Sequence, residues 1–530
     1  MQNPFRGLRP LVFWPPFLLL LLVVALHWIA PESFPETLDV AKSFVIEFFG
    51  WLFSLTALAA VLICVYVCFS KFRHVKLGGP DAQPIMPMWN WFAITVCTTI
   101  AVGILLWSTA EPLSHYHSPP ASLQIESTSS QSATFAMATM YLHWTFTPYA
   151  IYAAASLTFA FAYYNMRCPY SLGAMLRPIL GSRVEGKIGS LIDAICLYSL
   201  VAGMAASLGG GILILSGGLG YLFPSLPEKS IWLYGIIALV TIVTFVLSSA
   251  SGLMNGIRML SSINTYALFA LAIFVFLFGP TTFILSFGIE SFGVYLTRFF
   301  QMNLFADSLA STVTVDGKPS ANWASNWTVF YWAVWFAWTP ITACFLGQIA
   351  RGRTVQEFML VNFVFPSLFG AAWMAIFGGT ALHLEIFQEA NLQALLVADA
   401  SQTVRYEMVT YAIFEYLPMS FLLAVFYVAS TFVCFVTSAD SNTSAMAAIS
   451  TSGVSQDNVE ASTGLKVVWG TLVGVVAWVM ISFADVNGIK TISVLGGLPA
   501  CLLFIGILTS LITVIRDHET LQQNAESESP

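Results

Sequence analysis

The sequence predicts an all-α polytopic membrane protein, and three observations support this fold class. Hydrophobic residues make up 57% of the 530 positions and charged residues only 9%, with a mean hydropathy of +0.78. Apolar runs of membrane-spanning length recur along the whole chain, whereas a soluble protein with one anchor would contain a single run. The 20 Lys and Arg residues are distributed unevenly between alternate loops, which is the bias expected of a multi-span topology.

Twelve apolar runs predict transmembrane helices. They cover residues 11–31, 47–69, 89–109, 138–163, 189–216, 230–250, 265–287, 326–348, 359–381, 418–439, 465–484 and 492–514. The first run is too long for a signal peptide and lacks a cleavage site. Cytoplasmic termini put most Lys and Arg inside, so we expect a multi-pass protein of the inner (plasma) membrane with both termini cytoplasmic.

Composition and motif content argue against several other function classes. The net charge of −7 argues against nucleic-acid binding. The eight Cys lie in or beside predicted spans, without metal-ligand or redox spacing. Zinc-hydrolase, nucleophile-elbow and phosphate-loop motifs do not occur, so the sequence does not predict an enzyme or an ATP-driven pump. A membrane enzyme would need convergent polar groups at one depth, and only Asp440 and Glu111 are candidates.

The segment 326–358 concentrates aromatic residues in a membrane span, reading NWTVFYWAVWFAWTPITACFLGQIARGRTVQEF. At about 100° per residue, Tyr331, Trp335, Trp338 and Thr342 fall on one face of a helix. In a soluble helix this face would be an aromatic packing stripe. Within a membrane span, aromatic faces also suit a quaternary ammonium ion, because their quadrupole replaces water that the ion cannot hydrogen-bond.

This segment resembles the signature helix of the betaine/carnitine/choline transporter (BCCT) family, W-x-x-F-Y-W-A-W-W-x-x-W-x-P followed by A-R-x-S-R-G-R-[ST]-x-x-E-F. The matching residues are Trp327, Phe330, Tyr331, Trp332, Ala333, Trp335, Trp338, Pro340, Arg351, Gly352, Arg353, Thr354, Glu357 and Phe358. The chain departs from the pattern at Val334, where most members have Trp, and at residues 347–350.

Two further stretches resemble the same family. The first is T-A-E-P-L, with Glu111 near the outer end of its span, after a family Gly-rich break that here keeps only Gly103. The second is H-W-x-x-x-P-W-A-x-Y, in which Trp144 matches and Tyr149 replaces a Trp. Its Pro148 removes a helix hydrogen bond and permits a kink. An alternative for Trp144 is an interfacial belt residue.

The resemblance implies secondary active uptake, by symport, of a quaternary-ammonium or sulfonium compound such as glycine betaine, carnitine or choline. It implies substrate binding by six aromatic residues, namely Trp144, Tyr149, Tyr152, Trp332, Trp335 and Trp338. Two alternatives stay open, namely ion-independent exchange of trimethylammonium compounds and proton-coupled choline-type uptake.

The resemblance also implies one sodium ion as the coupling ion, with no other cofactor. Its ligands would be the side chains of Thr437 and Ser438 and the backbone carbonyls of Cys97 and Ile100. The exchangers of the family carry an Arg where this chain has Thr265, which leaves the positive charge to an ion. The alternative for the two hydroxyls is capping at a Ser/Thr/Asp-rich helix end.

For the fold, the resemblance implies an inverted 5+5 repeat (LeuT-like) core with two extra N-terminal helices, and a homotrimer in the lipid bilayer. The expected divisions are 1–88 (N-terminal tail and peripheral helices), 89–290 (first repeat), 291–325 (outer surface helix and loop), 326–515 (second repeat) and 516–530 (disordered cytoplasmic tail). We expect Asp193, near a cytoplasmic span end, to reach out to water rather than act as a proton relay.

Overall fold

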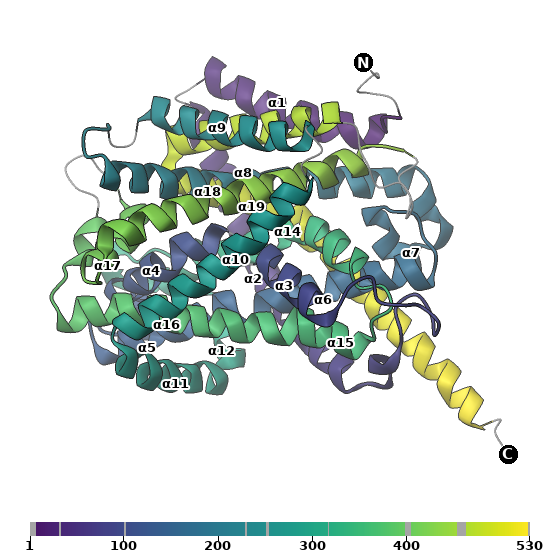
Figure 1. Ribbon diagram of the computed structural model, residues 1–530. Coiled ribbons are helices and arrows are strands. Elements are labelled where there is room, and N and C mark those ends of the chain that lie inside the picture. Colours follow the sequence, from purple (N-terminus) through teal and green to yellow (C-terminus); the bar gives the residue numbers. More distant parts are fainter. Residues whose placement is uncertain are drawn as a thin grey trace.

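The computed structural model describes residues 7–30, 33–99, 102–227, 230–250, 254–315, 317–397, 404–452 and 463–527. In these ranges the chain is almost entirely helical, and long helices pack side by side (Figure 1). The helices of the first half are α1 (Pro10–Ile29), α2 (Ser33–Phe69), α3 (Met88–Thr99), α4 (Val102–His117), α5 (Ser130–Trp144), α6 (Phe146–Ala160), α7 (Arg177–Leu180), α8 (Lys187–Leu222), α9 (Ile231–Ala250) and α10 (Met254–Phe278). Those that follow are α11 (Thr281–Thr297), α12 (Phe299–Asn303), α13 (Trp323–Asn326), α14 (Thr328–Gln348), α15 (Val355–Met359), α16 (Phe365–Phe387), α17 (Val409–Glu415), α18 (Ser420–Ile449) and α19 (Thr463–Ser527).

Short segments connect these helices. The 3₁₀ turns are η1 (Lys71–His74), η2 (Ala121–Leu123), η4 (Leu172–Leu176), η5 (Gly181–Glu185), η6 (Ala310–Thr312), η8 (Leu392–Leu395) and η9 (Tyr406–Met408). Two π-helical turns, η3 (Phe161–Asn165) and η7 (Leu360–Val364), extend α6 and join α15 to α16. The strands β1 (Thr314–Val315) and β2 (Lys318–Pro319) pair antiparallel in a small hairpin.

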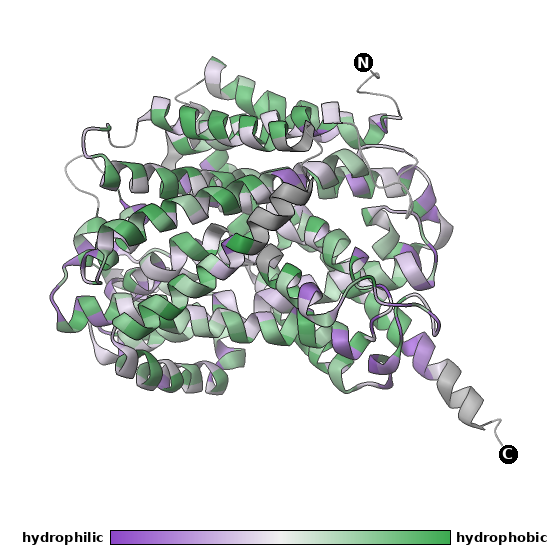
Figure 2. Ribbon diagram, viewed as in Figure 1, coloured by the Kyte–Doolittle hydropathy of each residue, from purple (hydrophilic) through white to green (hydrophobic). Residues whose placement is uncertain are grey.

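Within the described residues, seven helices are long and apolar enough to cross a membrane, or up to eight if one bent pair counts as a single span. Hydrophobic residues cover the bodies of the helices, and hydrophilic residues gather mainly at their ends and in the connections (Figure 2). The helices α1, α2 and α9 also expose large apolar side chains, among them Leu18, Trp51 and Trp232, as lipid-facing surfaces do. The polytopic membrane fold is therefore confirmed, while the count of twelve spans and the inverted repeat stay predictions.

The predicted spans 138–163 and 89–109 are each divided into two helices. The predicted span 138–163 is divided at Thr145, where the backbone leaves helical geometry with φ −125° and ψ −120°. The kink predicted from Pro148 explains this break, because a proline has no N–H for the carbonyl four residues earlier, here Trp144, and its ring crowds that carbonyl. In the predicted span 89–109, α3 ends at Thr99 and α4 begins at Val102. The predicted loss of glycines around position 100 lies partly outside the described residues.

The outer surface helix begins earlier than the sequence predicted. The chain bends by 104° between α10 and α11, so the surface helix starts at Thr281 rather than at residue 291. Gly279 and Pro280 occupy the bend, and they are the two residue types that most readily end a helix. The predicted span 265–287 is therefore split by this corner.

The predicted disordered tail is a further correction. The helix α19 continues through residue 516 to Ser527 and projects from the rest of the molecule (Figure 1). Contacts with α2 and η1 help to hold the part of α19 just beyond residue 516. Tyr66 of α2 donates a hydrogen bond to Glu519, and the Phe72 ring of η1 lies 5.6 Å from that of His518. Leu, Gln, Ala and Glu, which are good helix formers, make up much of this stretch.

The Arg-Gly-Arg motif after α14 joins two parts of the chain. Gly352 has a φ of +77°, and a Cβ there would lie 2.3 Å from the Gln83 carbonyl carbon, so only glycine fits. The guanidinium of Arg353 lies 5.1 Å from the Trp91 ring centroid and donates a hydrogen bond to the Met86 carbonyl. Thr354 and Glu357 then form a capping box that starts α15. The motif therefore attaches α15 to the segment between η1 and α3.

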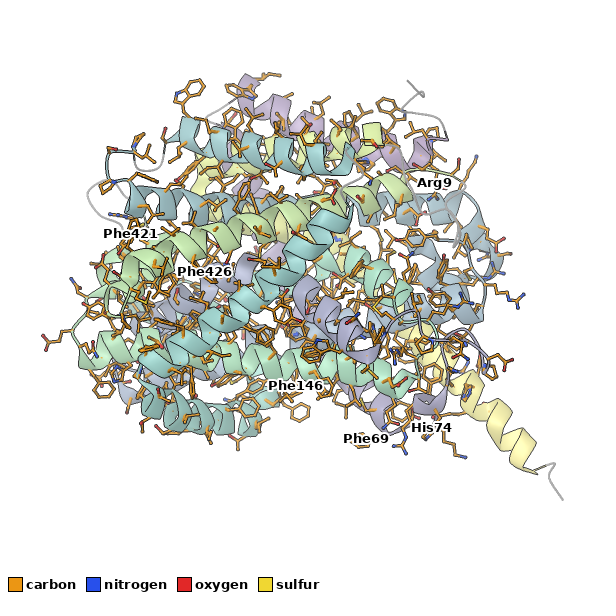
Figure 3. All side chains as sticks on the ribbon, viewed as in Figure 1. Arg9, Phe69, His74, Phe146, Phe421 and Phe426 are labelled. Carbon is orange, nitrogen blue, oxygen red and sulfur yellow. The ribbon has the colours of Figure 1, made fainter. Side chains whose placement is uncertain are left out.

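Asp193 of α8 is fully buried, contrary to the expectation that it would reach water. Its carboxylate accepts hydrogen bonds from the Ser171 hydroxyl and the Gly173 amide, and it pairs with Arg9 at 2.6 Å. The guanidinium of Arg9 also donates to the Ile449 carbonyl at the end of α18. Because buried carboxylates need a partner, the N-terminal segment supplies one and ties the ends of α8 and α18 together. Figure 3 shows Arg9 at the opposite end of α18 from Phe421.

We predict that Arg9→Met destabilises the protein by about 3–5 kcal/mol, because it leaves the Asp193 carboxylate buried without its counter-ion. Thermal unfolding of the detergent-solubilised protein measures this. The matched control is Lys42→Met, which removes the more exposed pair with Asp39 and should cost less than about 1 kcal/mol. Equal midpoints for the two variants would contradict the prediction.

Candidate functional site

The predicted aromatic residues of α14 lie against the break between α5 and α6. The ring centroid of Trp335 is 5.7 Å from Trp144, 6.0 Å from Tyr149 and 5.0 Å from Tyr152. All four side chains are buried, and the Trp335 indole N–H donates to the His143 carbonyl at 3.2 Å. We call Trp144, Tyr149, Tyr152 and Trp335 the aromatic cage. The sequence predicted all four, and the structure brings them together.

The two other predicted aromatic residues lie to the sides of this group. The Trp332 ring contacts the His143 ring edge-on at 5.8 Å, and Trp338 lies beside Gly203 of α8. Because each is three residues from Trp335, they are displaced about 60° in opposite directions around the helix. Their part in substrate binding stays a prediction, as does that of the aromatic cage.

Beside the aromatic cage lies a buried carboxylate with four hydrogen-bond donors. One oxygen of Glu111, Oε2, accepts from the Trp144 indole at 2.9 Å and from the Tyr331 hydroxyl at 2.6 Å. The other oxygen, Oε1, contacts His143 Nδ1 at 2.6 Å and His115 Nε2 at 3.1 Å. An ionised carboxylate only accepts hydrogen bonds, so these two ring nitrogens carry the protons. We call Glu111, His115 and His143 the Glu111 cluster.

The geometry of the Glu111 cluster favours hydrogen bonding. All three residues are fully buried, and charge-assisted donors from α4, α5 and α14 satisfy the carboxylate where water does not reach. Their ligand atoms lie within 4.8 Å of one another, close enough to surround an ion. However, the two oxygens of Glu111 already contact four donors, including Trp144 and Tyr331, so the carboxylate is fully hydrogen-bonded without a metal.

The sequence indicates Glu111 as a candidate, but it does not show that His115 and His143 are its partners. Glu111 and His115 are four residues apart and therefore share one face of α4. Two ionisable groups on one face of an apolar span are a signal for a functional site, and this signal was available. The position of His143 on α5 was not, because it depends on how the two helices pack.

An ammonium group lies close to the Glu111 cluster. The ammonium group of Lys490, on α19, lies 4.1 Å from the ring centroid of Trp327 and 5.4 Å from that of Phe330. It donates a hydrogen bond to the Asn326 carbonyl at 3.1 Å. Aromatic rings therefore already contact one ammonium group of the chain itself, in the geometry of a cation–π interaction.

The predicted sodium ligands are not assembled among the described residues. The Thr437 hydroxyl donates to the Val433 carbonyl, and the Ser438 hydroxyl accepts from the Asn442 side chain, so both are bonded within α18. Cys97 lies in α3 with its side chain outside the described part, and Ile100 lies outside the described residues. The sodium site stays a prediction.

The fold and the site together define a class, a polytopic helical membrane protein with a buried aromatic cage at a helix break. Comparison with known proteins specifies it further. Residues 11–520 match the profile of the BCCT family, described as betaine/carnitine/choline family transporters. The chain belongs to this family, and it is therefore a membrane transporter rather than an enzyme.

Three relatives illustrate the range of this family. The glycine betaine transporter OpuD of Bacillus subtilis is 29% identical over 94% of this chain and 93% of its own length. An ectoine/hydroxyectoine transporter of Virgibacillus pantothenticus is 28% identical, over 96% and 97% of the two chains. The osmo-independent choline transporter BetT1 of Acinetobacter baylyi is also 28% identical, over 99% and 96%.

We predict that Gly370→Ala destabilises the protein by about 1–3 kcal/mol, because a Cβ there would lie 2.4 Å from the Trp144 carbonyl oxygen. The carbonyl left free by the break at Thr145 occupies the space that this glycine provides. Thermal unfolding measures the loss. Gly293→Ala is the matched control, since a Cβ there meets nothing within 4 Å, and it should leave the midpoint unchanged. A wild-type midpoint for Gly370→Ala would contradict the close contact.

Proposed function

We propose that this chain takes up a quaternary-ammonium or sulfonium compound, such as glycine betaine, carnitine or choline, by symport with one sodium ion. The observation that carries the substrate class is the aromatic cage, in which three rings from α5 and α6 surround Trp335 of α14. Such rings stabilise a desolvated cation without requiring hydrogen bonds from it. Glycine betaine and choline are also named in the descriptions of two relatives.

The position of Glu111 adds to this proposal. Its carboxylate accepts the indole N–H of Trp144 and thereby places a negative charge directly behind one wall of the aromatic cage. A cation inside the cage is attracted by this charge, because the buried surroundings screen it weakly. The same charge disfavours an anionic substrate.

We propose a membrane arrangement consistent with this function, with twelve spans, an inverted 5+5 repeat and both termini in the cytoplasm. Arg9, near the start of the described residues, and the end of α19 lie toward the same end of the molecule (Figures 1 and 3). An even number of crossings requires this. The distribution of Lys and Arg supports the cytoplasmic assignment. A homotrimer is proposed from the family resemblance alone.

We predict that Trp335→Leu weakens binding of glycine betaine or choline roughly tenfold or more, because it removes the ring that contacts the three others. Binding is measured by isothermal titration or by tryptophan fluorescence with both compounds. Trp373→Leu is the control for loss of a buried indole, since its ring contacts Phe369 and Phe377 of α16. Unchanged affinity in Trp335→Leu would place the substrate elsewhere.

We predict that uptake shows a sodium Hill coefficient near one and that the double variant Thr437→Ala/Ser438→Ala abolishes sodium-dependent uptake. Both hydroxyls are bonded within α18, and the lone pairs that these bonds leave free would face the ion. Thr443→Ala, which loses only intrahelical bonds to the carbonyls of Ala439 and Asp440, is the control. Full transport by the double variant in sodium-free buffer at constant pH would refute sodium coupling and favour ion-independent exchange.

A further inference from the structure

One ring nitrogen of the Glu111 cluster makes no hydrogen bond to the described residues. His115 donates from Nε2 to Glu111, but its other ring nitrogen, Nδ1, has no hydrogen-bond partner among the described residues although the side chain is fully buried. Buried polar atoms without a partner are uncommon and call for an explanation. A neutral imidazole presents a lone pair at this nitrogen, so the cluster can accept a proton without losing an existing bond.

A cavity leads from the surface toward this cluster. It has a volume of about 270 Å³ and lies between α5, α11 and α12. Its lining includes Thr139, Glu290, Arg298, Gln301, Trp323 and Thr328. Glu290 and Arg298 are exposed, whereas Thr328 is buried at the start of α14. The cavity therefore connects an exposed charged rim with a buried hydroxyl.

That hydroxyl is bonded to the cluster. The oxygen of Thr328 lies 3.1 Å from His143 Nε2, and His143 Nδ1 lies 2.6 Å from Glu111. Because Nδ1 carries the proton that faces the carboxylate, Nε2 of a neutral His143 accepts the hydrogen of the Thr328 hydroxyl. The order of groups from the cavity is therefore hydroxyl, imidazole and carboxylate, which is a sequence that can transfer a proton.

We propose that the Glu111 cluster is a proton-binding site, reached from the cavity through Thr328, and that its proton competes with a cationic substrate in the aromatic cage. A hydronium ion in the cavity gives its proton to the Thr328 hydroxyl and becomes water. The hydroxyl passes its own hydrogen to His143 Nε2, and the Nδ1 hydrogen can then move to Glu111. One proton enters the cluster, and its net charge changes from −1 to zero.

The competition follows from the shared carboxylate. Trp144, which forms one wall of the aromatic cage, donates its indole N–H to the same Glu111 that faces both imidazoles. Neutralising this charge removes an electrostatic attraction for a cation in the cage. Because linkage is reciprocal, a bound cation must lower the affinity of the cluster for its proton by the same factor. This step depends on the proposed function, whereas proton binding itself does not.

The surrounding charges favour one proton rather than two. Around the cluster, Lys490 of α19 lies over Trp327, whose ring is 4.7 Å from that of His115. Its positive charge opposes a second positive charge. Further titratable groups on the packed elements include Tyr331 on α14, Tyr406 on η9, Lys42 on α2, the pair of His117 and Glu385 on α4 and α16, and Glu407 on η9, which faces Gly217 of α8.

The first test uses the full-length protein in lipid nanodiscs without substrate. Infrared difference spectra are recorded between about pH 8 and about pH 4, because a buried carboxylate with four hydrogen-bond donors gains a proton only under acidic conditions. We expect a carboxylate or imidazole signal in the wild type that Glu111→Gln removes. If Glu111→Gln does not fold, His143→Gln replaces it, because it removes the imidazole that passes the proton from Thr328 to Glu111, and it should also remove the signal. An identical difference spectrum in the folded variant would overturn the proton site.

The second test measures the linkage. At fixed sodium, the Kd for choline and for glycine betaine should rise at least about fivefold from pH 8 to pH 4, and Glu111→Gln should abolish this change. A Kd independent of pH in the wild type would overturn the competition. If neither compound binds, the proposed substrate class fails, but the first test still decides the proton site. Trp335→Leu should lose binding and retain the infrared signal.

The third test examines the route. After a rapid pH jump, Thr328→Val should slow the tryptophan fluorescence response at least tenfold, because valine keeps the shape and removes the relay hydroxyl. Thr139→Val is the matched control, since it lines the same cavity and its hydroxyl has no hydrogen-bond partner among the described residues. Equal rates in the two variants would overturn the route through Thr328.

Discussion

The carboxylate of Glu111 is the constraint on which the arrangement of the site depends. A charge that is buried this completely is stable only if strong donors surround it, and those donors come from three helices, α4, α5 and α14. Satisfying the carboxylate therefore fixes how these helices approach one another. The rings of Trp144 and Tyr331 take their orientation from the same requirement, so Trp144, one wall of the aromatic cage, is positioned by a hydrogen-bonded charge rather than by packing alone.

Two further charges among the described residues follow the same physical rule. Asp193 is buried with Arg9, and Lys490 is held over aromatic rings with a carbonyl as its acceptor. In each case a charge within the apolar body has a partner from a distant part of the chain. Because every such partner joins separate segments, few ionisable residues are enough to specify how many long helices pack.

Much of the site could be predicted from sequence, because aromatic periodicity and family resemblance identify residues one at a time. The four members of the aromatic cage were named in this way, and Pro148 indicated the break at Thr145. What could not be predicted depends on packing between helices. His143 meets Glu111 only because α5 lies beside α4, and Asp193 appeared solvent-accessible until Arg9 was found beside it. The helical end of α19 could not be predicted for the same reason, since its contacts come from α2 and η1.

The break at Thr145 has a mechanical consequence. Trp144 stands at the end of α5, whereas Tyr149 and Tyr152 belong to α6, so the aromatic cage is divided between two helical segments that no backbone ladder joins rigidly. A change in the angle between α5 and α6 must alter the separation of the rings. Under the proposed function, a substrate bound between the rings must resist that change. Under the proposed function, a substrate in the aromatic cage therefore couples its own binding to the angle between α5 and α6.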